Sequence, residues 1–349
     1  MTLRPGLDFR LPARDARRLS HCHLSTTLKR WLSSLFVLAA LVAATGPALA
    51  QTYPTKSIRI VAPSTPGDAP DVIARIVAER LTVALGQQVV VENRPGAGGV
   101  VGSEIVAKSA PDGYTLIMGN AGSHGINAAV YRKLPYNILQ DFAPISQIAV
   151  APNVFVVNPD LPVRTIPEFI AYAKARPGQL SYASGGNGSS SHMSMELLKS
   201  MAGIDVVHVP YKGSSPALTD VIGGQCAVMS VNMPPAVPHV KAGKLRALAV
   251  TTRTRTPSMP ELPTVGESLP GYETVAWFGV LAPAGTPKDI VDRLAGELAR
   301  IAKSPEMRER LAGMGAEPVG GTPEEFGAVM ARDIAQWTTL AKSVGITID

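Results

Sequence analysis

The stretch from Ile58 to Arg80 constrains the fold most, because it joins three kinds of local sequence in a fixed order. The apolar run Ile58–Ala62 predicts a buried strand, and the Pro/Ser/Thr/Gly-rich segment after it predicts a loop. From about Asp71, apolar residues at helical spacing predict an amphipathic helix. Such loops are where α/β sheets hold ligands, because the first-turn amides of the helix have no intrahelical partner. The loop 64–71 is therefore a candidate binding surface, and a plain capped connection is the alternative.

The first fifty residues have the composition of a secretory leader. Lys29 and Arg30 precede a mostly apolar run that ends in Ala48-Leu49-Ala50 and is too short for a membrane span. We expect a signal peptide over residues 1–50, cleaved after Ala50 and read by the general secretory route. Cys226 is then the one cysteine left after cleavage, so no intrachain disulfide is expected.

The basic charge of the whole chain comes mostly from this leader. The chain has 33 Lys and Arg against 27 Asp and Glu; the leader holds 7 and 2 of them, which leaves 26 and 25. A nearly neutral mature chain gives no reason to expect nucleic acid as a partner.

Strands and helices alternate through most of the remaining chain, which predicts an α/β protein with largely parallel sheets covered by helices. Predicted strands are 58–62, 88–92, 114–118, 145–150, 153–157, 180–183, 206–209, 226–231, 245–251 and 274–282. Predicted helices start near residues 71, 103, 166, 192, 216, 236, 287, 305 and 323, with Thr165, Thr286, Ser304 and Thr322 as N-caps of four of them.

A second loop with the same layout follows the predicted strand 180–183. Its residues are small or carry hydroxyl groups: Ser184, Gly185, Gly186, Asn187, Gly188, Ser189, Ser190 and Ser191. We expect its hydroxyls, and the backbone amides freed by its glycines, to converge on a carboxylate. A flexible turn with a serine N-cap is the alternative. If this loop and the loop 64–71 lie in different lobes, they face each other across a cleft.

Three further residues are weaker candidates for the cleft. Tyr211 follows a strand, next to Lys212, and Trp277 lies on an expected crossover strand. Ser123 lies in a small-residue loop after a strand. Core packing is the alternative for both aromatic residues, and a helix N-cap is the alternative for Ser123.

The motifs do not favour an enzyme, a cofactor or a metal. The segment Gly188–His192 lacks the closing glycine of a nucleophile elbow, and Ser and His this close in sequence rarely meet in catalytic geometry. The glycine-rich segment 93–102 matches neither nucleotide-binding motif and is interpreted as a structural turn. No histidine has a second ligand at metal-site spacing. A periplasmic hydrolase that uses the serine-rich loop is the least favoured alternative.

Motifs spread along the chain point to one family in combination. They include VENRPGAGG at Val91–Gly99, PDGYTL at Pro111–Leu116, GNGSSSH at Gly186–His192, HVPYKG at His208–Gly213, AGKLRALAVT at Ala242–Thr251 and APAGTP at Ala282–Pro287. Over Tyr53–Ile348 the chain resembles the periplasmic solute-binding proteins of tripartite tricarboxylate transporters, often called the Bug family.

The resemblance implies a two-lobed, type II periplasmic-binding fold, with 53–151 plus 276–349 as the first lobe and 152–275 as the inserted second lobe. It implies a small mono- or dicarboxylate, amino acid or aromatic acid as ligand. The first-loop residues matched to the site are Ser64, Thr65, Pro66, Gly67, Asp68 and Asp71, opposite the Gly/Ser loop. A periplasmic monomer whose closed form is recognised by membrane permease subunits is expected. A sensor that presents its closed form to a signalling receptor is the alternative.

The chain departs from the family at one position of the first loop. The family usually has Gly-Gly where this chain has Gly67-Asp68. Three roles are open for Asp68: to face solvent, to bind an ammonium group of the ligand, or to select against highly charged anions. We therefore expect monocarboxylates, amino acids or neutral-ended acids ahead of citrate-like ligands.

Overall fold

The computed structural model describes Trp31 and residues 53–348. Contacts divide the chain into two units, Met1–Gln51 and Thr52–Asp349, and the fold below is that of the second. Apart from Trp31, the predicted signal peptide and its cleavage after Ala50 lie outside the described residues. None of the described helices is long and apolar enough to cross a membrane.

The strands of this unit form one hydrogen-bonded path in which β4 belongs to two sheets. Their order is β2-β1-β3-β9-β4-β7-β5-β6, and β8 and β10 also pair with β4. The strands are β1 (Ile58–Ala62), β2 (Val89–Asn93), β3 (Thr115–Asn120), β4 (Phe142–Val157), β5 (Ser181–Ser184), β6 (Val207–Pro210), β7 (Val228–Asn232), β8 (Arg246–Val250), β9 (Val275–Pro283) and β10 (Glu317–Pro318). The prediction of largely parallel sheets is wrong around β4 and β9, which run antiparallel to all their neighbours.

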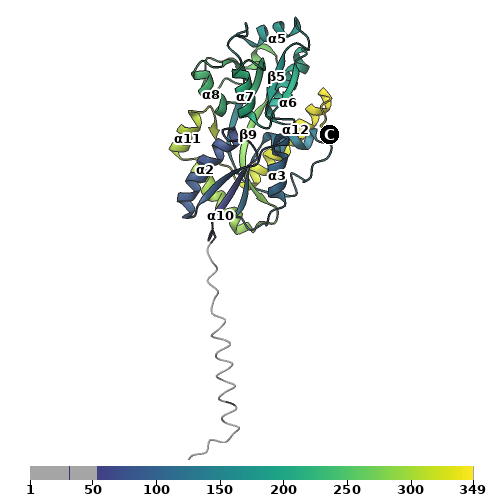
Figure 1. Ribbon diagram of the computed structural model, residues 1–349. Coiled ribbons are helices and arrows are strands. Elements are labelled where there is room, and N and C mark those ends of the chain that lie inside the picture. The colour runs from purple at the N-terminus through teal and green to yellow at the C-terminus, as the bar shows by residue number, and fades with distance from the viewer. Residues whose placement is uncertain (1–30, 32–52, 349) are drawn as a thin grey trace, which may run out of the picture. The chain divides into compact units, whose positions relative to one another are not determined.

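Strand β4 passes from one half of the fold to the other. Its first part pairs with β9 as far as Pro152 opposite Val275, and from Asn153 onward it pairs with β7 and β8. The prediction of two separate strands here is wrong, because the extended chain continues through Pro152. The pairing with β9 has register shifts between Pro144 and Ser146 and between Gln147 and Ala149. The label of β9 in Figure 1 lies at the junction of the two halves.

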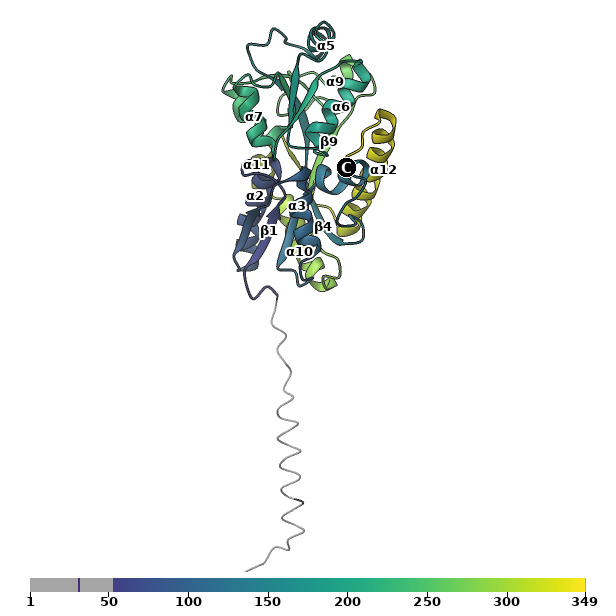
Figure 2. The ribbon, with the colours of Figure 1, turned by 45° about the vertical axis from the view of Figure 1, so that its right-hand side comes forward.

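Helices cover both faces of both sheets (Figure 1). They are α2 (Ala69–Leu85), α3 (Val100–Ala107), α4 (Asn127–Val130), α5 (Ile166–Lys174), α6 (Ser190–Ala202), α7 (Ser214–Ile222), α8 (Met233–Lys241), α9 (Val265–Ser268), α10 (Lys288–Ala302), α11 (Pro305–Ala312) and α12 (Pro323–Val344). Helices α2, α10 and α11 pack on one face of the first sheet, and α3 and α12 pack on the other. Helices α5 and α6 face α7 and α8 across the second sheet. Both halves are thus three-layered, and Figure 2 shows α12 alongside them.

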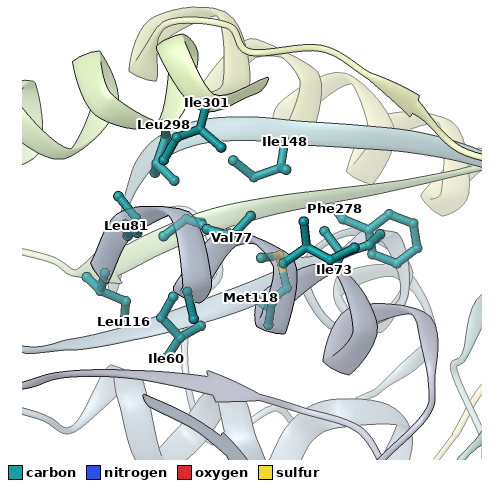
Figure 3. Close-up of a cluster of buried hydrophobic side chains, with 14 of the residues drawn as sticks. Ile60, Ile73, Val77, Leu81, Leu116, Met118, Ile148, Phe278, Leu298 and Ile301 are labelled. Carbon is teal, nitrogen blue, oxygen red and sulfur yellow. The ribbon is translucent and has the colours of Figure 1, made fainter. Parts of the chain in front are cut away.

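The core of the first half follows from the two periodicities in the sequence. Ile60 of β1 points at α2, whereas its neighbour Val61 points at the opposite layer with α3 and α12. From α2, the buried residues Ile73, Val77 and Leu81 are spaced one helical turn apart and meet the sheet (Figure 3). Each such fully buried side chain stabilises the fold by roughly 1.5–3 kcal/mol.

Helix starts agree with the predicted caps in three cases out of four. The hydroxyls of Thr165, Ser304 and Thr322 accept hydrogen bonds from the third amide of their helices. The prediction of Thr286 as the N-cap of α10 is wrong, because its hydroxyl donates to the carbonyl of Pro283 instead.

Candidate functional site

A cavity of about 50 Å³ lies where loops of the two halves meet. It is lined by Pro63, Ser64, Asp68, Pro70, Gly96, Gly98, Gly99, Asn120, Gly185, Ser189, Ser190, Ser191, Lys212, Gly213, Ser214 and Asn232. The loop after β1 and the loop after β5 therefore face the same space, and the cavity has room for a few waters or one compact polar group.

The Gly/Ser loop uses its glycine amides internally. Those of Gly185, Gly186 and Gly188 donate to Ser191 Oγ (2.9 Å), Ser184 Oγ (3.1 Å) and His192 Nδ1 (3.3 Å) respectively. The expectation that the glycines leave these amides free is wrong, because the loop folds back on its own side chains.

The open donors belong instead to the first turn of α6. Ser189 is the N-cap, and its hydroxyl accepts from the amide of His192. The amides of Ser190 and Ser191 have no acceptor in the described part of the chain. Two converging backbone donors at the positive end of a helix suit an anion.

Two stacked histidines, His192 and His208, are hydrogen-bonded to residues of the Gly/Ser loop. The ring of His208 stacks on His192, with 4.3 Å between centroids, and on Tyr182 at 4.7 Å. Ser184 Oγ accepts from the Gly186 amide and is hydrogen-bonded to His208 Nε2 at 2.6 Å. Burial lowers the pKa of His192 to about 4 and that of His208 to about 3, so both rings are neutral at neutral pH. The Nδ1 atom of neutral His192 accepts from the Gly188 amide. Ser184 itself is fully buried and does not line the cavity.

Asp71 shapes the first loop from below. Its carboxylate accepts from the Gly67 amide (2.8 Å) and from Asn93 Nδ2 (2.9 Å), and it pairs with Arg75 at 2.9 Å. Burial acts to raise the pKa of Asp71, but these donors outweigh it, and the pKa is lowered. Asp71 and Gly67 therefore support the loop without lining the cavity.

Ser64 is the first-loop residue best placed for a ligand. Its hydroxyl is buried, and it has no hydrogen-bond partner among the described residues. The neighbouring Thr65 hydroxyl is likewise buried without a partner, whereas Pro66 contributes a carbonyl that accepts from Ser215. A buried hydroxyl without a partner costs roughly 1–3 kcal/mol, so Ser64 is poised for a ligand or a water.

Asp68 reaches across the cavity. Its Oδ2 accepts from the Ser214 amide (2.9 Å), and its Oδ1 accepts from the Ser215 amide (2.6 Å) and hydroxyl (2.8 Å). The residue is 3% exposed, so the solvent-facing role is excluded. Burial raises the pKa of Asp68, and the hydrogen bonds from Ser214 and Ser215 act in the opposite direction. A carboxylate from the first half therefore caps helix α7 of the second half.

The glycine-rich segment after β2 is the part of the site that sequence reasoning missed. Gly98 has φ +59°, and a Cβ there would lie 2.2 Å from the carbonyl oxygen of Asn187. The hydroxyl of Tyr131 donates to the carbonyls of Ala97 (3.1 Å) and Asn187 (3.3 Å), so the two halves touch at this point. The usable signal was position: the segment follows a strand that neighbours β1, so it ends at the same edge of the sheet.

The three weaker candidates lie away from the cavity. Tyr211 bonds to Asp220 (2.5 Å), and Trp277 is buried in the core with its indole N–H on Asp333 (2.9 Å). Ser123 is fully buried, and its hydroxyl contacts the adjacent His124 ring. Lys212, the neighbour of Tyr211, does line the cavity and is exposed.

The described residues show neither a metal cluster nor a catalytic serine. They contain no group of three or more His, Cys, Asp or Glu side chains that could hold a metal ion. Ser190 Oγ lies 3.5 Å from the amide nitrogen of Asn232, and the acceptor nitrogen of His192 is used by the Gly188 amide. Within the described chain, Ser190 thus has no base in hydrogen-bonding contact.

Residues 73–346 match the family model described as "Tripartite tricarboxylate transporter family receptor". The chain belongs to this family. BugT of Bordetella pertussis is 36% identical over 320 residues, which cover 91% of this chain and 98% of BugT. The family is one of receptors, and the resemblance found in the motifs is confirmed.

Three solved structures share the fold. R. palustris Rpa4515 with adipate is 41% identical, with a TM-score of 0.83, over 84% of this chain and 99% of that one. The periplasmic binding protein BugD is 34% identical, with a TM-score of 0.82, over 84% and 99%. MatC from Rhodopseudomonas palustris with bound malate is 33% identical, with a TM-score of 0.79, over 82% and 99%. This chain of the tripartite tricarboxylate receptor family has the two-lobed α/β fold of periplasmic binding proteins, as predicted.

Proposed function

We propose that this chain is a periplasmic receptor that closes on a small organic carboxylate and delivers it to a tripartite tricarboxylate-type permease. One observation carries the proposal: the cavity between the two loops is lined by donors that lack protein partners in the described chain. They are the Ser190 and Ser191 amides, the Ser64 hydroxyl and the Lys212 ammonium group. Converging neutral and charged donors suit a carboxylate, and relatives carry adipate and malate.

The mechanism is lobe closure in a monomer. In this proposal, residues 53–151 and 276–349 form one lobe and residues 152–275 form the other. The change of pairing partner on β4 at Pro152–Asn153 supports this boundary. A ligand that contacts both loops at once binds the closed form better than the open form, so it shifts the population towards closure.

A thermal-shift screen tests the binding function. The mature chain from Gln51 is mixed with a library of mono- and dicarboxylates, aromatic acids and amino acids, with matched alcohols and amines as controls. An acid at one hundred times its Kd adds roughly 2.7 kcal/mol to the free energy of unfolding and raises the melting temperature. A library in which no acid raises the melting temperature would overturn the proposal.

Partner capture tests the delivery step. The protein is immobilised with and without the acid found in the screen and exposed to permease subunits or to a signalling-receptor ectodomain. Acid-dependent retention of the permease supports delivery. Retention of the receptor ectodomain instead would make the chain a sensor.

A further inference from the structure

Two helices of the second half begin at the cavity, and their N-termini are neighbours. Helix α6 starts at Ser190 and α7 at Ser214, and both residues line the cavity. The Gly185 amide donates to Ser191 Oγ in the first turn of α6, and a Cβ on Gly185 would lie 3.0 Å from Ser214 Oγ, so only Gly185 separates the two starts here. Each N-terminus presents backbone N–H groups to an anion.

The two N-termini differ in what they bind. In the described chain, the α6 amides of Ser190 and Ser191 face no acceptor. The corresponding α7 amides, from Ser214 and Ser215, both donate to the carboxylate of Asp68. One of the two anion positions is therefore already filled by a side chain of the protein.

The Asp68 side chain is available to bind the N-terminus of α7 because it does not cap its own helix, α2. Asp68 stands at the N-cap position of α2, yet its side chain makes no capping bond there. The N-cap position of α7 is Gly213, which has no side chain to offer. Both oxygens of Asp68 meet only N–H and O–H groups, which is the pattern of an ionised carboxylate.

We propose that Asp68 is a resident carboxylate that fills the α7 position and restricts the receptor to ligands with a single carboxylate group, bound at α6. The inference rests on the function proposed above and names the class of acid. A dicarboxylate would place its second charge beside Asp68 in a small cavity. Lys212 is the one cationic side chain among the described lining residues, so it cannot offset two neighbouring carboxylates fully.

The test uses pairs of acids that differ only in the second carboxylate. Butanoate and succinate, hexanoate and adipate, and benzoate and terephthalate are titrated calorimetrically into four proteins. These are the wild type, Asp68→Gly, Asp68→Asn and the control Asp220→Asn. Asp220 lies on α7, whose N-terminus Asp68 binds, but its side chain bonds to Tyr211 and does not line the cavity.

In the pair of acids that binds best, the wild type and Asp220→Asn are expected to bind the monocarboxylate at least about tenfold more tightly than the dicarboxylate. Asp68→Gly exposes the α7 amides, so its affinity for the dicarboxylate is expected to rise about tenfold or more. Asp68→Asn keeps the side-chain volume and loses the charge. Its preference for the monocarboxylate over the dicarboxylate is therefore expected to become smaller, but not to reverse. Amide hydrogen exchange without ligand gives an independent readout: the amides of Ser214 and Ser215 exchange faster in Asp68→Gly than in the wild type.

Two results would overturn this inference and leave the proposed function standing. The first is a wild type that binds a dicarboxylate as tightly as its monocarboxylate partner. The second is an Asp68→Gly variant with an unchanged ratio of affinities. If no acid binds any of the four proteins, the proposed function fails, and the inference falls with it.

Discussion

The backbone amide of Ser215 donates a 2.6 Å hydrogen bond to Oδ1 of Asp68, which lies 147 residues earlier in the chain. The bond joins the loop after β1 to the start of α7, so it exists only while the two halves are together. In the proposed mechanism, closure brings these two loops into close contact, so a single added atom between them is expected to disturb it.

Replacement of Gly213 by alanine is expected to block closure. A Cβ there would lie 2.2 Å from Thr65 Oγ1 and 2.8 Å from Asp68 Oδ2, both on the opposite half. The φ of 169° is extended backbone that alanine also adopts, so the open form is not strained. We expect acid affinity to fall about tenfold or more, with the free energy of unfolding within about 1 kcal/mol of the wild type.

Gly223→Ala is the matched control, because Gly223 stands at the other end of α7 and is exposed. Titration calorimetry and urea unfolding are measured on both variants. Equal affinities of Gly213→Ala and Gly223→Ala would show that closure at Gly213 does not contribute to binding.

Replacement of Ser190 by proline is expected to remove one amide donor while α6 stays intact. Ser190 is the first helical residue, a position that tolerates proline, and Ser189 has the extended φ of −71° and ψ of 158° that precede a proline. Ser190→Ala removes only the hydroxyl. We expect acid affinity to fall about tenfold in Ser190→Pro and less than about fivefold in Ser190→Ala, because hydrogen bonds to charged groups are strong. If both variants bind with the same affinity, the amide is not a ligand donor.

The stability of the protein is expected to depend on pH through His192. Its pKa is about 4 in the folded chain, against 6.5 for an ordinary histidine, because of burial. Between these values the unfolded chain binds the additional proton, so the free energy of unfolding falls as pH drops from about 6.5 to 4, by roughly 2–3 kcal/mol. Asp333 acts in the opposite direction: burial raises its pKa to about 6, so its contribution is lost as pH rises through 6.

His192→Asn isolates the histidine effect, because an asparagine oxygen replaces the Nδ1 acceptor for the Gly188 amide but does not titrate. Urea unfolding between pH 4.5 and 7.5 is compared in the two proteins. The difference in unfolding free energy between them is expected to change by about 2 kcal/mol across this range, in the direction of a relative gain for the variant at low pH. Parallel curves would mean that His192 is not buried in its neutral form.

Trp277→Phe is expected to lower stability and leave ligand binding unchanged. The indole N–H donates to Asp333 Oδ2 at 2.9 Å, and the indole of Trp337 donates to the other oxygen at 3.1 Å. Loss of one donor to this buried carboxylate costs about 1–3 kcal/mol. Trp337→Phe, which removes the second donor, is expected to show a similar loss in urea unfolding. A Trp277→Phe variant with normal stability and weakened acid binding would show that Trp277 contributes to ligand binding.

The sequence predicted the strand–loop–helix layout well where local patterns decide it. Strand β1 has the predicted bounds, Ile58–Ala62. Helix α2 begins at Ala69, two residues before the expected start at Asp71, although Pro70 in the first turn was a readable signal. The continuity of β4 through Pro152 was not readable, because it depends on pairing with β9, more than one hundred residues later.

The site was partly predictable, because the local sequence of each loop shows which polar residues follow a strand and precede a helix. The layout of each loop indicated that residues such as Ser64 and Ser190 could face one space, and the structure brings them to one cavity. What each donor does within its loop could not be predicted. The Gly188 amide donates to His192 Nδ1 four residues later, which depends on how the loop folds back on α6. The Asp68 carboxylate accepts from the Ser214 amide, which is a tertiary contact between residues 146 positions apart.

The most direct measurement is a crystal structure of the mature protein with the acid that gives the largest thermal shift. We expect the ligand carboxylate within hydrogen-bonding distance of the Ser190 and Ser191 amides, with Asp68 still bound to Ser214 and Ser215. A ligand carboxylate on the Ser214 and Ser215 amides, with Asp68 displaced, or an acid bound outside this cavity, would contradict the account.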